Sequence, residues 1–204
     1  MADNRVITIA RGYGSGGRTI GQMLAKDMGW GFYDKELLQM ASDDSGISEG
    51  LFAKADENAH RSLFSRGGDV LDGKVIPPDS GAFTSDENLF RYQAKIIRQL
   101  AATENCIIVG RCADYILKDE PNVLRLYIHA PFDACIRAVM QRDGISQEEA
   151  AKQIREIDKR RGDYYKQFTG TDWQDADHYD LCLNSARLGW DRCLELVKGY
   201  LQLI

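Results

Sequence analysis

The feature that most constrains the fold is a glycine-rich stretch near the start of the chain, ARGYGSGGRTIG, which runs from Ala10 to Gly21 and holds five glycines. An apolar run from Val6 to Ala10 comes directly before it, and apolar residues at helical spacing follow it. This order predicts a buried strand, a loop and a helix. Glycine loses more conformational entropy on folding than any other residue, which disfavours a plain turn built from so many of them. The stretch therefore predicts a loop whose backbone comes close to a ligand.

Two classes of ligand fit this loop. The glycines between Gly12 and Gly17 match the dinucleotide pattern G-x-G-x-x-G, and Asp34 stands further on as a candidate ribose-binding acid. The same glycines, followed by Arg18 and Thr19, match the phosphate-loop pattern G-x-x-x-x-G-K-[ST] with arginine in place of lysine. A triphosphate site needs a cation and a magnesium-binding hydroxyl after the last glycine, whereas a dinucleotide fold needs small uncharged residues there. The loop favours the phosphate loop and leaves the dinucleotide site as the alternative.

Short β-rich runs alternate with helical periodicity along the rest of the chain. This alternation predicts an α/β fold with a largely parallel sheet covered on both faces, forming one domain over residues 1–204. In such sheets ligands bind at the carboxyl ends of the strands, near the point where the strand order reverses. The expected strands are Val6–Ala10, Gly31–Tyr33, Cys106–Val109, Leu124–Ala130 and Tyr179–Asn184.

Local patterns also predict helix starts and core residues. A Ser or Thr followed three residues later by Glu is typical of a capping box at the start of a helix. Two such pairs, Thr84 with Glu87 and Ser146 with Glu149, predict the starts of two helices. An apolar stripe predicts that the last helix faces the core, and apolar surroundings predict that four cysteines are buried. The stripe consists of Trp190, Cys193, Leu194, Val197 and Leu201, and the four cysteines are Cys106, Cys135, Cys182 and Cys193.

Composition excludes several classes of function. The net charge of -5 argues against a general nucleic-acid binder, so any phosphate site must use a local basic cluster. No apolar stretch approaches the ~18 residues of a membrane span, and an odd number of scattered cysteines with no signal peptide favours the cytoplasm. The three histidines are dispersed, which argues against a zinc site. A cytoplasmic enzyme acting on a small molecule, as a monomer or a homodimer, is expected.

Basic residues in the second half of the chain strengthen the phosphate-loop interpretation. Arg111 and Asp114 follow the third expected strand, so they should lie at the carboxyl edge of the sheet, where a planar guanidinium suits a phosphate. A dense run from Arg155 to Lys166, which includes Arg160 and Arg161, suits a lid over phosphates. In the first half of the chain, residues 56–86 are rich in Gly, Pro, Ser and Asp and predict a long loop that moves or binds something.

Several motifs together resemble the cytidylate kinase-like family, a branch of the P-loop nucleoside monophosphate kinases. They are YGSGGRTIGQMLA, FYDKELL, IIVGRCADYIL, LYIHAPFDACIRAVM, IDKRRGDYYKQFTG and YDLCLNSARLG, in the family's order over nearly the whole chain. The resemblance implies a P-loop-type five-stranded parallel sheet with an acceptor-binding excursion, here residues 40–90, and an arginine-rich lid, here residues 144–175. It also implies a Mg²⁺-dependent kinase that moves the γ-phosphoryl group of ATP to a nucleoside monophosphate or another small metabolite.

The resemblance also assigns roles to individual residues. Nucleotide-binding residues would be Gly12, Gly14, Ser15, Gly16, Gly17, Arg18 and Thr19, with Thr19 also a magnesium ligand. Catalytic residues would be Arg18, Asp34 and Arg160; acceptor-binding residues Asp34, Arg111 and Asp114; and lid residues Arg155, Arg160 and Arg161. Two alternatives remain: a nucleotide-binding sensor without catalysis, motivated by Arg18 in place of lysine, and a nicotinamide-dependent oxidoreductase, motivated by the glycine pattern.

Overall fold

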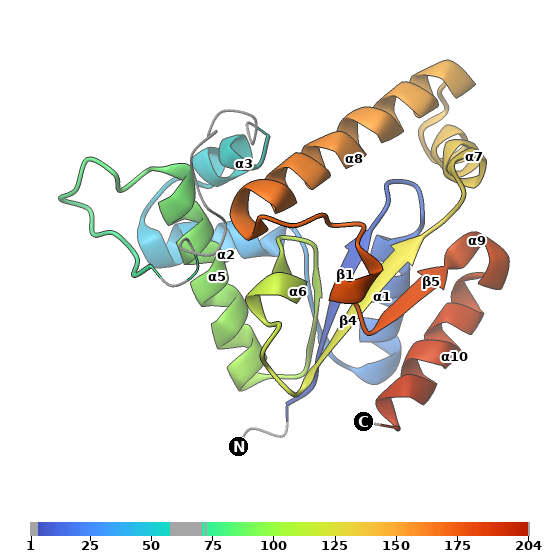
Figure 1. The fold of residues 1–204 in the computed structure, drawn as a ribbon, viewed down its shortest axis with the longest axis horizontal. Coiled ribbons are helices and arrows are strands. Elements are labelled where there is room, and N and C mark those ends of the chain that lie inside the picture. Colours follow the sequence, from blue (N-terminus) through green and yellow to red (C-terminus); the bar gives the residue numbers. More distant parts are fainter. Residues whose placement is uncertain (1–3, 58–70, 72, 204) are drawn as a thin grey trace.

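A computed structural model describes residues 4–57, 71 and 73–203 (Figure 1). Five strands form one parallel sheet in the order β2-β3-β1-β4-β5, with β1 at its centre. The alternation of strands and helices, and the five-stranded parallel sheet implied by the resemblance, are both confirmed. The strands are β1 (Val6–Arg11), β2 (Gly31–Tyr33), β3 (Cys106–Val109), β4 (Val123–His129) and β5 (Leu181–Asn184).

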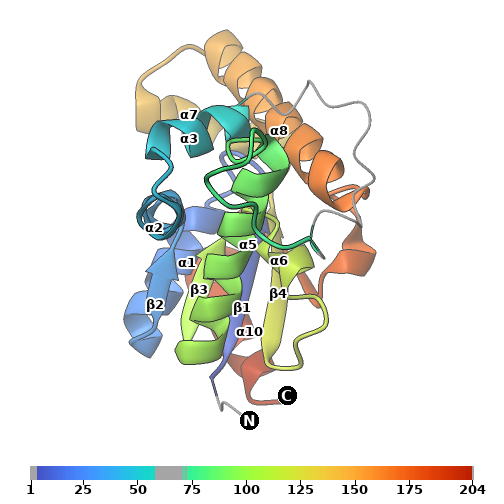
Figure 2. The ribbon, with the colours of Figure 1, turned by 90° about the vertical axis from the view of Figure 1, so that its left-hand side faces the viewer.

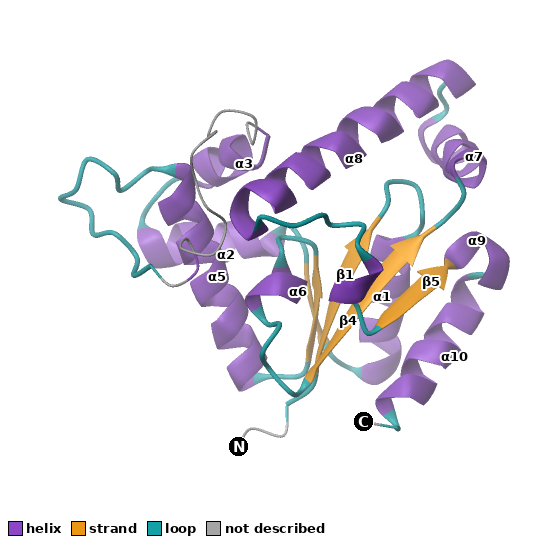
Figure 3. Cartoon of the chain, in the orientation of Figure 1, coloured by secondary structure: helices purple, strands orange, loops and turns teal. Residues whose placement is uncertain are grey.

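The chain leaves β1 and builds β2 and β3 on one side of it, then returns to build β4 and β5 on the other side. The strand order therefore reverses at β1, and the glycine loop follows β1 directly. The loops after β1 and β4 leave the sheet at the same end (Figure 3). This is the end at which open parallel sheets bind ligands.

One face of the sheet is covered by α1 (Gly17–Met28) and α10 (Trp190–Leu201), whose apolar residues pack against Ile7, Ile9 and their neighbours in the other strands. This face of the sheet is thus apolar, as expected for a sheet that is covered by helices.

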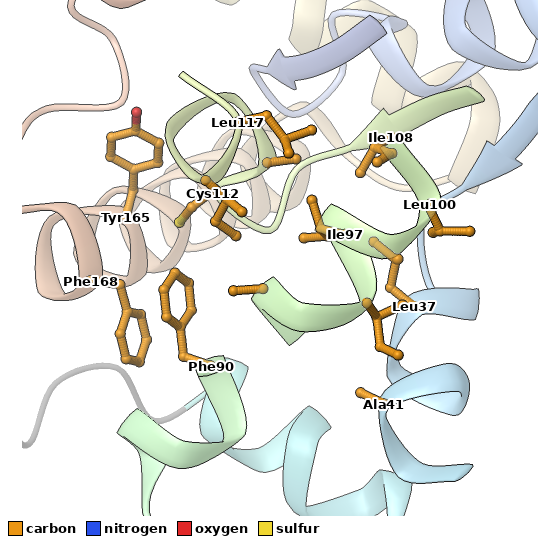
Figure 4. Close-up of a cluster of buried hydrophobic side chains, with 14 of the residues drawn as sticks. Leu37, Ala41, Phe90, Ile97, Leu100, Ile108, Cys112, Leu117, Tyr165 and Phe168 are labelled. Carbon is orange, nitrogen blue, oxygen red and sulfur yellow. The ribbon is translucent and has the colours of Figure 1, made fainter. Parts of the chain in front are cut away.

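The opposite face carries the larger apolar cluster. In Figure 4 its residues come from α2 and α5 on one side and from the C-terminal part of α8 on the other. The rings of Phe90 and Phe168 stack at 4.2 Å between centroids, which joins α5 to α8. The helices on this side are α2 (Glu36–Ser45), α3 (Glu49–Glu57), α5 (Asp86–Thr103), α6 (Ala113–Ile116) and α8 (Gln147–Thr169).

Helix α7 (Phe132–Asp143) and the long helix α8 lie beyond the carboxyl ends of the strands (Figures 1 and 2). The N-terminal part of α8 packs on α7 in a small separate cluster that includes Val139 and Ile154. The predicted capping box of α8 is confirmed: Ser146 accepts a hydrogen bond from the Glu149 amide, and the Glu149 side chain accepts one from the Ser146 amide. The chain then passes through η1 (Ala176–His178), β5 and α9 (Ser185–Leu188) to α10.

Three expectations from local patterns are wrong. The N-cap of α5 is Ser85 and not Thr84, because the Ser85 hydroxyl accepts from the Asn88 amide, and the buried Asn88 side chain bonds the backbone of the preceding loop. Cys182 is exposed because β5 is an edge strand. Trp190 is 48% exposed although the rest of its stripe packs toward the core, because the indole of this first residue of α10 lies against Gly16 at the start of α1.

The expected loop over residues 56–86 is seen only at its two ends, since residues 58–70 and 72 lie outside the described part. Its start belongs to α3, and residues 73–85 form turns before α5. No helix within the described ranges is both long enough and apolar enough to cross a membrane.

Candidate active site

A cavity of about 1080 Å³ lies at the carboxyl end of the sheet. It is lined by the glycine loop, by the residues that follow β2 and β3, by α7 and α8, and by the first residue of α10. The structure thus brings together most of the residues that the sequence singled out. Those that line the cavity are Gly12, Gly14, Gly16, Gly17, Arg18, Thr19, Asp34, Arg111, Asp114, Arg160 and Arg161.

Two predicted site residues are not among the lining residues. Ser15 is buried beneath the loop, where its hydroxyl donates a hydrogen bond to the Ile128 carbonyl at 3.0 Å. Arg155 lies earlier on α8, with its guanidinium 5.0 Å from the centre of the Phe132 ring in α7. The side chain of Ser15 therefore supports the loop from below, and Arg155 joins α8 to α7 instead of facing the cavity.

The glycine loop holds its shape through close backbone packing. Gly14 and Gly16 have φ of 81° and 80°, in the left-handed region that favours glycine. A Cβ at Gly14 would lie 2.9 Å from the Cys135 carbonyl oxygen, and one at Gly16 would lie 2.6 Å from Nε1 of Trp190. Only a residue without a side chain fits at either position.

The loop leads into a helix end that is ready for an anion. Helix α1 begins at Gly17 and has no hydrogen bond from a side chain at its N-cap. The first amides of a helix have no partner within the helix and carry a partial positive charge. Their position at the cavity, beside Arg18 and Thr19, makes this helix end a phosphate-binding site in chemical terms.

Asp34 is the main carboxylate beside the loop. It is 6% exposed and follows β2, and its Oδ2 accepts a hydrogen bond from Nε of Arg18 at 2.6 Å. Nη2 of Arg11 lies 3.7 Å from its other oxygen. Arg11, the last residue of β1, was not predicted as a site residue. Its place immediately before the glycine loop was the one sequence signal for it.

The turn after β3 has an unusual backbone. Gly110, Arg111 and Cys112 have φ of 76°, 59° and 54°, so three successive residues lie in the left-handed region. A residue other than glycine in that region costs about 1–3 kcal/mol, and such strain is concentrated at functional sites. The turn brings Arg111 and Cys112 to the wall of the cavity.

Asp114, just after this turn, is fully buried and lies against α8. Its Oδ2 accepts a hydrogen bond from the Tyr165 hydroxyl at 2.6 Å. Burial raises the pKa of the Asp114 carboxyl, and this effect outweighs the opposite effect of the hydrogen bond from Tyr165. Burial also raises the pKa of Tyr165. The pair places a phenol hydroxyl and a carboxyl group, joined by a hydrogen bond, at the end of the cavity next to β3.

A second carboxylate on α8 contacts the glycine loop. Oδ1 of Asp158 accepts the amide hydrogen bond of Tyr13 at 2.8 Å and a bond from Nη1 of Arg161 at 3.2 Å. The same Arg161 nitrogen donates to the Arg11 carbonyl at 3.1 Å. Burial raises the pKa of Asp158 and lowers that of Arg161. Sequence reasoning missed Asp158, because nothing in the local pattern shows which acidic residue of a charged helix meets the loop.

Tyr13 is a residue through which the glycine loop meets both α7 and α8. Its hydroxyl accepts hydrogen bonds from Arg142 of α7 at 2.6 Å and from Gln153 of α8 at 3.0 Å. Its ring has the Arg142 and Arg161 guanidinium groups at 5.0 and 5.4 Å from its centre. Tyr13 therefore joins the glycine loop to α7 and α8, two consecutive helices that come much later in the sequence.

The charge of the cavity is opposite to that of the whole protein. Six arginines and one lysine line it, against two aspartates, while the chain as a whole carries -5. A concentration of guanidinium groups at open helix amides selects ligands with several negative charges. Within the described residues there is no group of three His, Cys, Asp or Glu side chains that could hold a metal ion. The basic lining residues are Arg11, Arg18, Arg111, Arg142, Arg160, Arg161 and Lys35.

Several known proteins are similar to this chain in sequence or in fold. A cytidylate kinase from Thermococcus sibiricus is 35% identical over 104 residues, which is 50% of this chain and 53% of that protein. The matched region thus spans about half the length of this curated relative. A crystal structure of an uncharacterized protein from Eubacterium ventriosum is 26% identical, with a TM-score of 0.71 and coverage of 98% of this chain and 99% of that chain.

A shikimate kinase from Bacteroides thetaiotaomicron shares the fold at 12% identity, with a TM-score of 0.55 and coverage of 97% of this chain and 98% of that chain. The sequence model of the cytidylate kinase-like family matches residues 6–187, a range that includes the glycine loop, both aspartates of the cavity and the arginines of α8. On the strength of that match, this chain belongs to the cytidylate kinase-like family.

Proposed function

We propose that the protein is a kinase that transfers the γ-phosphoryl group of ATP to a nucleoside monophosphate or to another small metabolite. The observation that carries this proposal is the cavity, which joins an uncapped helix end after a glycine loop to six arginines in an otherwise acidic protein. Phosphoryl transfer requires mainly alignment and neutralisation of charge, and these groups supply both.

The glycine loop is the proposed donor site. The amides from Gly14 to Thr19 would surround the β- and γ-phosphates, and the Thr19 hydroxyl would be the protein ligand of Mg²⁺. Mg²⁺ commonly uses one or two protein oxygens and completes its shell with water and phosphate oxygens, so a single hydroxyl beside the phosphates fits it. Bound there, the ion would neutralise charge on the phosphates.

The proposed transfer step uses residues from both walls of the cavity. Arg18 and Arg160 would stabilise the charge on the phosphoryl group as it moves. Asp34 lies against Arg18 and would orient the acceptor or accept its proton. Arg161 is held by Asp158 and by the Arg11 carbonyl, so it would contribute positive charge from a fixed position.

The acceptor would bind on the side of β1 that carries β2 and β3. Arg111 would contact its phosphate and Asp114 its polar edge, since both line the cavity after β3. The match to the cytidylate kinase-like family, and the similarity to a cytidylate kinase, support a nucleoside monophosphate as the acceptor.

The test is a phosphoryl-transfer assay with ATP and Mg²⁺ against the four common ribonucleoside monophosphates and a set of hydroxyl-bearing metabolites. Arg18→Ala should lower turnover about 10³-fold, because it removes a phosphate-clamping arginine. Arg192→Ala, an exposed arginine outside the cavity, is the matched control and should leave turnover unchanged. Full activity of Arg18→Ala would refute its role, and tight ATP binding with no transfer to any acceptor would favour a sensor.

A further inference from the structure

We propose that Trp190 is the platform on which the nucleobase of the donor nucleotide stacks. The inference rests on the proposed function, because it assumes that the glycine loop holds the phosphates of a nucleotide. Trp190 lines the cavity and is 48% exposed. Tryptophan has a large apolar ring and is highly buried on average in folded proteins, so this exposure is unusual. An exposed indole at the wall of a charged cavity needs a partner, and a flat base is a fitting one.

The indole touches the phosphate loop itself. Its Nε1 lies 2.6 Å from the position that a Cβ of Gly16 would occupy, so the ring edge rests on the bare backbone of that residue. Gly16 is the N-cap of α1 and thus belongs to the proposed phosphate site. A base joined to those phosphates by one ribose lies within reach of the indole.

The strand order places Trp190 on the donor side of the cavity. Asp34 and Arg111 follow β2 and β3, on one side of β1, whereas Trp190 follows β5 on the other side. Gln141 and Arg142 of α7, the helix that follows β4 on this same side of β1, also line the cavity. The acceptor and the donor base therefore have separate regions, with the phosphate loop between them.

The other aromatic residues of the cavity have no free ring face. Tyr13 carries a guanidinium group near its ring from two different helices. Tyr164, Tyr165 and Trp173 are buried. Among the aromatic residues that line the cavity, Trp190 is thus the one that presents open ring surface.

Stacking of a base on an aromatic side chain is worth about 1–3 kcal/mol by alanine substitution, which corresponds to about 5- to 150-fold in affinity. Because every base has a π-face, the platform contributes affinity for nucleotides in general and little discrimination among bases. Inorganic tripolyphosphate has the same phosphates and no base, so it separates the two contributions.

The experiment measures dissociation constants of ATP and of inorganic tripolyphosphate, each with Mg²⁺, by calorimetry on four proteins: wild type, Trp190→Ala, Trp190→Phe and Leu196→Ala. Trp190→Ala should weaken ATP binding by about 5- to 150-fold and leave tripolyphosphate binding unchanged. Trp190→Phe, which keeps a ring, should recover most of the ATP affinity. Leu196 is the matched control, because it lies on the same helix, is 46% exposed and is not among the cavity-lining residues.

The outcomes separate this inference from the proposed function. If Trp190→Ala lowers the affinity for ATP and for tripolyphosphate equally, the indole acts by shaping the glycine loop through Gly16. If Trp190→Ala leaves the affinity for ATP unchanged, the indole contacts no base. Either result overturns the inference alone. A wild-type protein that binds neither ligand overturns the proposed function, and the inference with it.

Discussion

The glycine loop and helix α8 both form walls of the cavity, and different kinds of contact hold them in place. Gly14, Ser15 and Gly16 each contact a different element, namely α7, α9 and α10. Helix α8 instead meets the loop through charged side chains, chiefly the Asp158 carboxylate on the Tyr13 amide. Backbone packing allows the loop one arrangement, whereas ionic contacts can exchange partners when a charged ligand arrives. In the proposed function, the donor phosphates would therefore meet one preformed wall and one adjustable wall.

The packing of α8 supports this difference. Its C-terminal half, with Tyr164 and Phe168, belongs to the main apolar cluster on the sheet. Its N-terminal half, with Ala150 and Ile154, packs with α7 in the small separate cluster. Segments with few buried apolar contacts open at lower free-energy cost than the main core. Arg160 and Arg161, which line the cavity, therefore lie where the separately packed half of α8 meets the half anchored in the main cluster.

The largest expected effect comes from one arginine of α8. Arg160 is exposed and lines the cavity, so Arg160→Ala should fold normally and lower turnover by about 10³-fold. The comparison predicts that ATP binding, which depends mainly on the preformed loop, falls much less than turnover. Steady-state kinetics and calorimetry on the same variant separate the two.

Arg155 gives this prediction a control on the same helix. Its guanidinium lies over the Phe132 ring, so Arg155→Ala should cost about 0.5–1 kcal/mol of stability and leave turnover unchanged. If both alanine variants lose activity equally, the arginines of α8 act as a general positive patch and the placement of Arg160 at the cavity has no special role.

The preformed wall is tested at Gly14. Gly14→Ala would force a side chain into the left-handed region, 2.9 Å from the Cys135 carbonyl oxygen. Because the backbone has no room to give way, we expect ATP binding to weaken and turnover to fall about 10²-fold, the loss of rate typical of a displacement of about 1 Å at a site. Gly50→Ala is the control: it lies in α3 with open space around it and should raise stability by about 0.5–1 kcal/mol. Unchanged ATP binding in Gly14→Ala would show that the loop adapts.

The wall formed by the glycine loop is one continuous stretch of the chain, and its residues could be predicted from the sequence. The glycines, the strand before them and the helix after them determine the phosphate loop locally, so its residues could be named in advance. The five strands were also found within two residues at each end, because buried parallel strands give short apolar runs. Arg18 and Asp34 could be named one by one, but their direct contact at 2.6 Å could not.

The second wall could not be predicted in the same detail. A run of charges on a helix shows that arginines are present, but the direction in which each side chain points depends on the tertiary packing of that helix. Thus Arg155 and Arg160, five residues apart, point to different neighbours, an aromatic ring and the cavity. Trp190 was expected in the core because its helix has an apolar stripe, but the structure places its indole against Gly16 at the wall of the cavity.

The contact between the two walls gives a smaller expected effect. Asp158→Ala removes both the acceptor of the Tyr13 amide and the partner of Arg161, whereas Asp158→Asn keeps an acceptor oxygen and loses the charge. A hydrogen bond to a charged group contributes about 1.5–3 kcal/mol, so the alanine variant should raise the KM for ATP by about tenfold, and the asparagine variant by less. Asp163→Asn, in an exposed pair with Lys159, should change nothing. An equal rise in the KM for ATP in the two Asp158 variants would show that the effect on ATP binding comes from the charge of Asp158 and that a neutral acceptor oxygen does not replace it.

The smallest expected effect is a change in the pH dependence of stability at Asp114. Because burial raises the pKa of this carboxyl in the folded state, the folded protein holds its proton more tightly than the unfolded chain does. Its contribution to stability is therefore complete below the ordinary carboxyl pKa of about 3.9 and is lost as pH rises through the folded-state value. Asp114→Asn cannot titrate and still offers an oxygen to the Tyr165 hydroxyl, so its free energy of unfolding relative to wild type should increase from pH 4 to pH 8 in urea titrations. A difference that stays constant over this range would mean that Asp114 is ionised in the folded protein throughout, and that this end of the cavity presents a full negative charge to the acceptor.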